Sequence, residues 1–175
     1  KTTAKLSVSA FAGDGADIAS YLYSGPDVYV STTSNNITTG SIQYSGTLTY
    51  TVQVTDTRGR SASALTQIYV HQYSIPAMGS VSVSRCDANG NLTESGTYAK
   101  YTINSTYADV GWKNTRTITV AYSSNNGVSY SSATTLQAAS DTNSYKTGVY
   151  GGGLFALANT YLRQFSITDA YGVTD

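Results

Sequence analysis

Four oxygen-bearing side chains gather in the stretch "CDANGNLTE", and they form the densest group of metal-type ligands in the chain. They are Asp87, Asn89, Asn91 and Glu94. Carboxylate and amide oxygens at such spacing are typical of a calcium loop, but that loop has glycine at its sixth position, whereas Gly90 is at the fourth. We therefore expect an exposed turn here, and we predict neither a metal ion nor any other cofactor.

Carboxyl groups that could act as a catalytic pair are scarce. Glycoside hydrolysis needs two carboxyl groups held close together, and the chain has a single glutamate, Glu94, besides nine aspartates that mostly stand in turn-like stretches. Asp14 and Asp17 in "GDGAD" are the only close acidic pair. The neighbouring glycines indicate a solvated loop, so we predict no acid–base pair.

Nucleophilic chemistry has equally little support. His71 is the only histidine and stands at the end of a predicted strand, and no serine lies in a nucleophile-elbow motif. The lone Cys86 cannot form a disulfide within the chain, and we interpret it as a small, semi-buried apolar residue. No catalytic residue is predicted, and we expect that the protein is not an enzyme.

Two aromatic residues are candidates for contact with a sugar, because a ring face exposed in a loop can stack on one. They are Trp112 in "DVGWKN" and Tyr150, which precedes "GGG". The alternative for Trp112 is that its ring closes one end of a β-sandwich core. We favour this alternative, and we retain both residues as the candidate surface contacts.

The stretch "SSNNGVSY" at residues 123–130 resembles, in degenerate form, the Asp-box hairpin of sialidases. That box is structural even in those enzymes. Asn126-Gly127 is also a strong two-residue hairpin turn, because both residues accept a positive φ. We expect a turn without a catalytic role.

The composition excludes two classes of partner. Ten basic and ten acidic residues cancel, and charged residues make up 11% of the chain, so no basic surface for nucleic acid or an anionic membrane is expected. No stretch is long enough to insert into a membrane. The first residues lack the pattern of a secretory signal, and we expect the chain to be part of a longer protein.

The elements that would position these residues are short β-strands. Leu48, Tyr50, Val52 and Val54 alternate with polar residues, and a second alternating run follows at 62–70. Between the runs, "TDTRG" supplies an aspartate and a glycine for a tight corner. The pattern predicts a hairpin, and similar runs and turns recur along the chain without any helical period.

The same corner returns in "YLRQFSITDAYG" at Asp169, which predicts two copies of one fold in tandem. Pro76 in "QYSIPAMG" cannot join a central strand, so the boundary is placed at 73–77. We predict an all-β protein with two tandem immunoglobulin-like or fibronectin-III-like β-sandwich domains, residues 1–73 and 74–175. Only three residues follow the second corner, and we expect the second domain to stop before the end of its last strand.

Several segments resemble one family. They are "YTVQVTDTRGRSAS", "YSIPAMGSVSVSRCDANGNLTESGTYAKYTI", "KNTRTITVAYSS" and "TDAYGVTD". They are similar to the Ig-like repeats of minor structural proteins in the tails of siphophages and prophages of Gram-positive bacteria. In that family T-D-x-R-G-R, Tyr-x-x-Pro and R-C-D-x-x-G-N follow one another, as they do here at residues 55–60, 73–76 and 85–91.

The resemblance implies a non-enzymatic structural component of a phage tail, a spacer or tail-tip module that faces the host, located in the virion. Its partners would be other tail proteins or further copies of the same chain in an oligomer. The family offers no catalytic residue to carry over. Two alternatives stay open: an adhesion module that binds carbohydrate or host cell-wall polysaccharide, and a repeat of a secreted bacterial adhesin.

Overall fold

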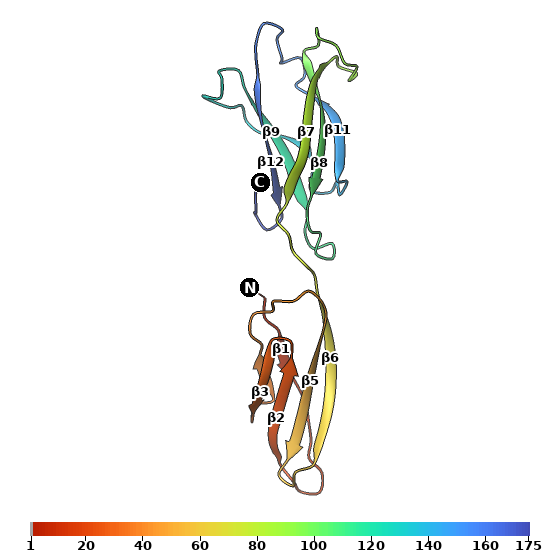
Figure 1. Ribbon diagram of the computed structural model, residues 1–175, viewed down its shortest axis with the longest axis vertical. Helices are drawn as coiled ribbons and strands as arrows, with labels where there is room; N and C mark the ends of the chain where they lie inside the picture. The colour runs from red at the N-terminus through yellow and green to blue at the C-terminus, as the bar shows by residue number, and fades with distance from the viewer. Residues whose placement is uncertain (1) are drawn as a thin grey trace. The chain divides into compact units, whose positions relative to one another are not determined.

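The computed structural model describes residues 2–175. All regular secondary structure in that range is β-strand, so the predicted all-β fold is confirmed. All strand pairs are antiparallel. The chain divides into two compact units, Lys1–Gln72 (unit 1) and Tyr73–Asp175 (unit 2); both are shown in Figure 1. In the described range there is no helix that could cross a membrane.

Unit 1 combines a four-stranded sheet, in the order β3-β2-β5-β6, with the pair β1-β4. Alternation places Tyr21 and Tyr23 of β2 and Leu48 and Tyr50 of β5 on one face, where they pack with Leu6 of β1 as the core. The strands are β1 (Lys5–Ser7), β2 (Ile18–Gly25), β3 (Val28–Thr32), β4 (Asn36–Thr38), β5 (Gly46–Asp56) and β6 (Ser61–Val70).

Unit 2 consists of two three-stranded sheets, β10-β9-β12 and β11-β8-β7. Tyr101 and Ile103 of β8 pack against Ile118 of β9 and Ile167 of β12, so the core lies between the two sheets as in a β-sandwich. The strands are β7 (Ala77–Cys86), β8 (Tyr98–Thr106), β9 (Arg116–Ser123), β10 (Thr134–Gln137), β11 (Tyr145–Tyr150) and β12 (Leu162–Asp169).

The two units share an arrangement of five strands, β1–β5 in unit 1 and β8–β12 in unit 2. In unit 1, β2 pairs with β3 and β5, and β1 pairs with β4. In unit 2, β9 pairs with β10 and β12, and β8 pairs with β11, in the same chain order. The two differ at the sheet edges: β7 pairs with β8, whereas β1 has only β4 as its partner among residues 2–72. After the second corner, Thr174 forms a bridge with Thr168 of β12, where unit 1 has β6 beside β5.

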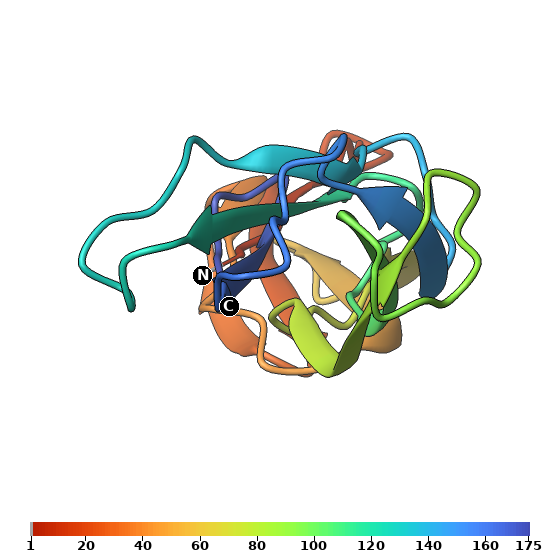
Figure 2. The ribbon, with the colours of Figure 1, turned by 90° about the horizontal axis from the view of Figure 1, so that it is seen from above.

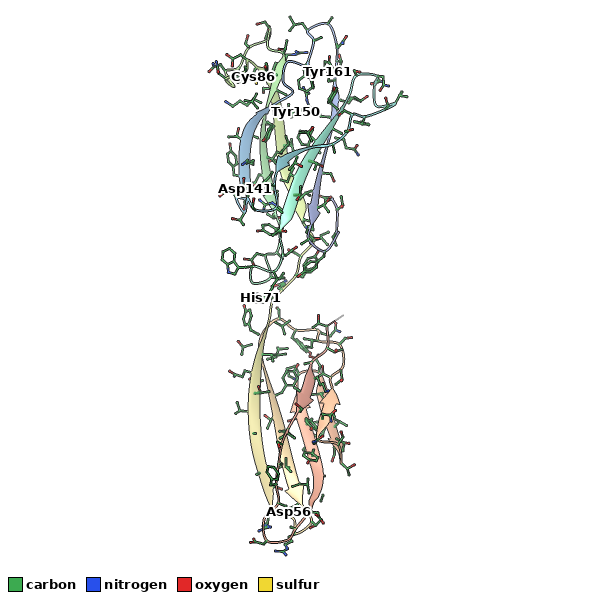
Figure 3. The ribbon with its side chains drawn as sticks, turned by 180° about the vertical axis from the view of Figure 1, so that it is seen from behind. Asp56, His71, Cys86, Asp141, Tyr150 and Tyr161 are labelled. Atoms are coloured by element: carbon green, nitrogen blue, oxygen red, sulfur yellow. The ribbon has the colours of Figure 1, made fainter. Side chains whose placement is uncertain are left out.

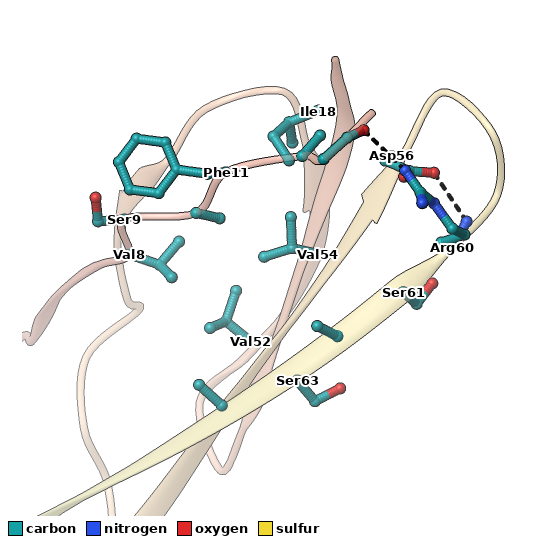
Figure 4. A pocket seen from close by; sticks show the side chains of 15 residues that line it. Val8, Ser9, Phe11, Ile18, Val52, Val54, Asp56, Arg60, Ser61 and Ser63 are labelled. Carbon is teal, nitrogen blue, oxygen red and sulfur yellow. Dashed lines mark hydrogen bonds and ion pairs between the residues drawn. The ribbon is translucent and has the colours of Figure 1, made fainter. Parts of the chain in front are cut away.

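The segment that follows β1 borders an apolar hollow in unit 1. Its volume is about 410 Å³, and it lies between residues 8–13 and strands β5 and β6. Figure 4 shows the aliphatic side chains of Val8, Ile18, Val52 and Val54 pointing into it. The Asp56–Arg60 ion pair stands at its rim, with 2.8 Å between Asp56 Oδ2 and Arg60 Nε.

The β9–β10 loop, residues 124–133, projects from the sheets of unit 2, as Figure 2 shows. Asn126 and Gly127 both adopt positive φ, 58° and 88°, as predicted for this turn. Ser123 Oγ accepts the backbone N–H of Gly127 at 2.9 Å, and Asn125 Oδ1 accepts that of Ser129 at 3.0 Å. Local side-chain hydrogen bonds therefore hold this loop together.

Candidate functional site

Trp112 lies in the loop between β8 and β9, and its side chain points into solvent with 84% of its surface exposed. Val110, Gly111 and Trp112 all have positive φ, which turns the chain sharply before β9 begins. The backbone N–H groups of Lys113 and Asn114 bond to the carbonyl of Asp109 at 3.0 and 2.9 Å and close this turn. The interpretation that Trp112 closes the core is therefore wrong.

Tyr150, the second predicted surface residue, is half-buried at the end of β11. Its ring packs against the core of unit 2 and lies 5.8 Å from the ring centre of Phe155. Tyr150 pairs with Ala99 near the start of β8, whereas Trp112 follows the last residue of β8, Thr106. The two predicted residues thus lie at opposite ends of one strand and do not form a common site.

Tyr150 belongs instead to a cluster of four rings, Phe155 and the three tyrosines around it, which we call the aromatic cluster. Phe155 is fully buried, and its ring centre lies 5.6 Å from Tyr122, 5.8 Å from Tyr150 and 5.1 Å from Tyr161. These separations, with tilted or edge-on rings, are favourable for aromatic pairs. In Figure 3, Tyr150 and Tyr161 lie toward the end of unit 2 that holds Cys86, and Asp141 lies toward the other end.

Two loop features bring Phe155 into this position. Its backbone N–H donates to the carbonyl of Thr97 at 3.0 Å, which fixes the loop against the start of β8. Gly151 has a φ of 109°, and a Cβ atom there would meet the Phe155 ring at 2.3 Å. Glycine at 151 is thus required both by the backbone conformation and by the close approach of the ring.

A shallow hollow of about 450 Å³ opens on one side of the aromatic cluster, and we call it the tyrosine hollow. Tyr122 and Tyr150 contribute rings, and Ser131, Ser132 and Thr134 contribute hydroxyl groups. Ring surface beside hydroxyl donors and acceptors suits the alternating apolar and polar faces of a sugar. The tyrosine hollow is the candidate functional site.

The stretch "CDANGNLTE", which was compared with a calcium loop, forms a tight corner. The Asp87 carboxylate accepts hydrogen bonds from its own loop. Asp87 Oδ1 accepts the backbone N–H groups of Asn89 and Asn91, each at 2.9 Å, and Gly90 has a φ of 84°. The Asn91 side chain, which bonds to Asp87 Oδ2, contributes most to lowering the pKa of Asp87. Within residues 2–175, no three His, Cys, Asp or Glu side chains are grouped as metal ligands would be.

The other residues weighed for chemistry have structural partners. Asp14 forms an ion pair with Arg60, with 2.9 Å between Asp14 Oδ2 and Arg60 Nη1. The His71 ring packs edge-on against Tyr69, with the ring centres 4.8 Å apart. Cys86 is fully buried, beyond the semi-buried position expected, and burial, with a smaller effect of Asp87, raises the pKa of its thiol.

Sequence reasoning found Tyr150 but missed the rest of the aromatic cluster. Tyr122, Phe155 and Tyr161 come from β9 and from the loop before β12, so no local spacing marks them as neighbours. The one local signal is "GGG" at 151–153, where all three glycines have positive φ and let the loop fold back over the core.

No protein-family model matches the chain, and neither the curated proteins nor the solved structures include a significant match. The resemblance to phage tail repeats therefore stays a prediction from the sequence motifs.

Proposed function

We propose that the chain is a non-enzymatic structural module of a phage tail, a spacer or tail-tip part that faces the host. The observation that carries this proposal is the repetition of one five-strand arrangement, β1–β5 in unit 1 and β8–β12 in unit 2. Each unit has its own core, and residues 71–76, between β6 and β7, contain no strand. Tandem modules of this kind can extend a protein by adding copies, as a tail component requires.

The motifs of the corners and of the joining segment support the same proposal, because they occur in the order found in phage tail repeats. Partners would then be other tail proteins or further copies of this chain, and the protein would be located in the virion. Incubation with cell-wall polysaccharide or peptidoglycan should release no product. If product were released, and if replacing one acidic residue by a neutral one abolished this release, the non-enzymatic assignment would be wrong.

The location can be tested with particles from a culture of the encoding organism after induction of its prophages. An antibody raised against the purified chain should label the tails in electron micrographs, and peptides of the chain should occur in purified particles. A control antibody against an abundant cytoplasmic protein should label nothing. Labelling of the bacterial surface, with no peptides in the particles, would reject the tail assignment and favour the adhesin alternative.

The tyrosine hollow favours a second candidate function, binding of a cell-wall glycan. The observation is the combination of the Tyr122 and Tyr150 rings with three hydroxyl side chains in one depression. A glycan array should show binding by the natural protein and loss of binding by Tyr150→Leu, provided that the variant keeps its melting transition. Trp112→Ala, at the opposite end of β8, is the matched control and should bind as the natural protein does.

A further inference from the structure

A second hollow, of about 280 Å³, opens beside the aromatic cluster, and we call it the arginine cavity. Arg85 of β7 and Arg163 of β12 contribute its charged groups. Its remaining polar lining comes from Ser84, Asn159, Thr160 and Tyr161. No aspartate or glutamate lines this cavity, so its charge is positive.

The backbone around it holds the Arg85 guanidinium in place. Arg85 Nη1 donates to the carbonyls of Gly96 and Phe155 at 2.8 and 2.9 Å, and Nη2 donates to those of Ala156 and Asn159 at 3.1 and 3.4 Å. These acceptors are neutral, so they fix the group without cancelling its charge. Arg85 is thus a positioned positive charge.

Arg163 has no such set of acceptors. Its guanidinium lies over the Phe155 ring, 4.6 Å from the ring centre, and its Nε is buried with no hydrogen-bond partner among residues 2–175. Burial lowers the pKa of Arg163, and the neighbouring Arg85 lowers it further. A buried donor without an acceptor is costly and calls for an explanation.

Neither arginine forms an ion pair with a carboxylate within the described residues. Two like charges in a partly desolvated hollow repel each other, and an anion placed between them would remove the repulsion. The planar guanidinium can also donate two parallel hydrogen bonds to a carboxylate or phosphate. The arrangement has the charge, the donors and the space for such a group.

We propose that the arginine cavity binds an oxyanion, a phosphate or carboxylate group of the kind that anionic sugars carry. Arg163 would be the principal contact and Arg85 the fixed second charge, with the hydroxyl of Thr160 as a further donor. Phe155 contacts Arg163 of the arginine cavity and also Tyr122 and Tyr150 of the tyrosine hollow. A negatively charged sugar could therefore place its ring and its anion on adjacent surfaces of unit 2.

The test is a titration of the isotope-labelled protein followed by two-dimensional NMR, which resolves backbone amides and arginine Nε–H groups. The probes are inorganic phosphate, glucuronate and neutral glucose, each at constant ionic strength set with sodium chloride. Phosphate, glucuronate or both should shift the Arg163 Nε–H signal and the amides of residues 159–163 along a saturating curve. Added salt should weaken the binding, because part of it is electrostatic.

Arg163→Gln removes the charge, and Lys113→Gln is the matched control, since Lys113 is an exposed cation at the other end of β8. We expect at least a tenfold loss of affinity in Arg163→Gln and none in Lys113→Gln. If Arg163→Gln fails to fold, Arg163→Lys takes its place in the experiment. This variant keeps a positive charge and should retain part of the binding.

A shift with phosphate alone identifies a phosphate ligand, and a shift with glucuronate alone identifies a carboxylate; either result supports an oxyanion site. The absence of shifts around Arg163 up to tens of millimolar of both anions would overturn it, and this measurement needs no variant. Unchanged binding in a folded Arg163→Gln would overturn it too. Failure of neutral glucose to bind would count against the glycan role of the tyrosine hollow and leave the oxyanion site intact.

Discussion

Asp56 and Asp169 make the same hydrogen bonds at the same corner of unit 1 and unit 2. Asp56 Oδ1 accepts the backbone N–H groups two and four residues ahead, from Arg58 and Arg60, each at 2.9 Å. Asp169 Oδ1 accepts those of Tyr171 and Val173, at 2.9 and 3.0 Å. Gly59 and Gly172 follow with φ of 79° and 78°. The repeated sequence motif thus encodes one repeated turn, with the aspartate replacing missing backbone acceptors.

Asp169 has a larger role than Asp56, and its removal should destabilise unit 2. Its Oδ2 also accepts the Tyr73 hydroxyl at 2.7 Å and the Asn114 side-chain amide at 3.2 Å. Asp169→Ala would remove this acceptor from the Tyr73 hydroxyl and from one N–H of the buried Asn114 amide, besides the backbone bonds of the corner. We expect a loss of about 3 kcal/mol in the unfolding free energy of unit 2. Denaturant unfolding combined with hydrogen exchange would assign the loss to a unit.

Asp56→Ala is the matched variant for that experiment and should weaken unit 1 while leaving the exchange of unit 2 unchanged. A loss below about 0.5 kcal/mol in Asp169→Ala, the range of an ordinary surface substitution, would contradict the role given to this corner.

Alkaline pH should weaken unit 2 through Tyr73. The hydrogen bond to Asp169 raises the pKa of Tyr73 from 10.0 to about 12, with burial and the charge of Asp169 adding to the effect. Because the folded pKa is the higher one, the contribution of Tyr73 to stability is complete below pH 10.0 and is lost as the pH rises to about 12. Tyr73→Phe should be less stable at neutral pH and should show a smaller decline across this interval.

The measurement is the unfolding free energy of both proteins at several pH values, and the quantity of interest is the difference between them. Tyr145→Phe, which changes an exposed tyrosine of the same unit, serves as the control. If the natural protein and Tyr73→Phe decline in parallel from pH 10 to 12, the Tyr73–Asp169 bond does not stabilise the fold.

Acid should weaken the same unit through Asp141. The hydrogen bond from Lys146, with those from Asn143, lowers the pKa of Asp141 from 3.8 to about 2. A depressed folded pKa means that the stabilisation is present above pH 3.8 and is lost as the pH falls to about 2. Asp141→Asn should therefore differ from the natural protein at pH 6 and converge with it near pH 2. A constant difference across this range would show that the ion pair contributes nothing.

The strands and corners could be predicted because their signals are local. Leu48 and Tyr50 alternate with threonines, and both are buried in β5 as that alternation requires. The corner at Asp56 needs only one side chain and one glycine within four residues. Such features depend on neighbours in the sequence, so they can be recognised without knowledge of the tertiary structure.

The aromatic cluster and the arginine cavity could not be predicted in this way. Arg85 meets the carbonyl of Phe155 across a sequence separation of 70 residues, and the contact depends on how β7 and the loop before β12 are placed by the two sheets. Trp112 was misjudged because its exposure follows from positive φ at Val110, a β-branched residue for which the sequence gives no such sign. Burial of the indole ring was expected only because a tryptophan often closes the core of a β-sandwich.

Replacement of Trp112 should leave the fold intact, because 84% of its surface is exposed. We expect Trp112→Ala to change the unfolding free energy of unit 2 by no more than about 0.5 kcal/mol. Since Trp112 is the only tryptophan, its fluorescence in the folded natural protein should already be quenched efficiently by a soluble quencher. A loss above about 2 kcal/mol, with poor quenching before unfolding, would restore the interpretation that the ring closes the core.

Gly151 and Gly152 offer a direct test of the aromatic cluster, because both have positive φ but only one lies against Phe155. A Cβ at Gly151 would meet the Phe155 ring at 2.3 Å, whereas a Cβ at Gly152 has no heavy atom within 4 Å. Gly152→Ala should cost about 1 kcal/mol for the left-handed backbone alone. Gly151→Ala bears a backbone cost of its own and adds a clash that displaces the ring, for which we expect a further loss of about 1–3 kcal/mol.

Displacement of Phe155 should also change the near-ultraviolet circular dichroism of the tyrosines and reduce binding at the tyrosine hollow and the arginine cavity, since the ring supports both. Equal destabilisation by the two substitutions, with unchanged dichroism, would mean that Phe155 is not packed beneath Gly151 and does not support the two hollows.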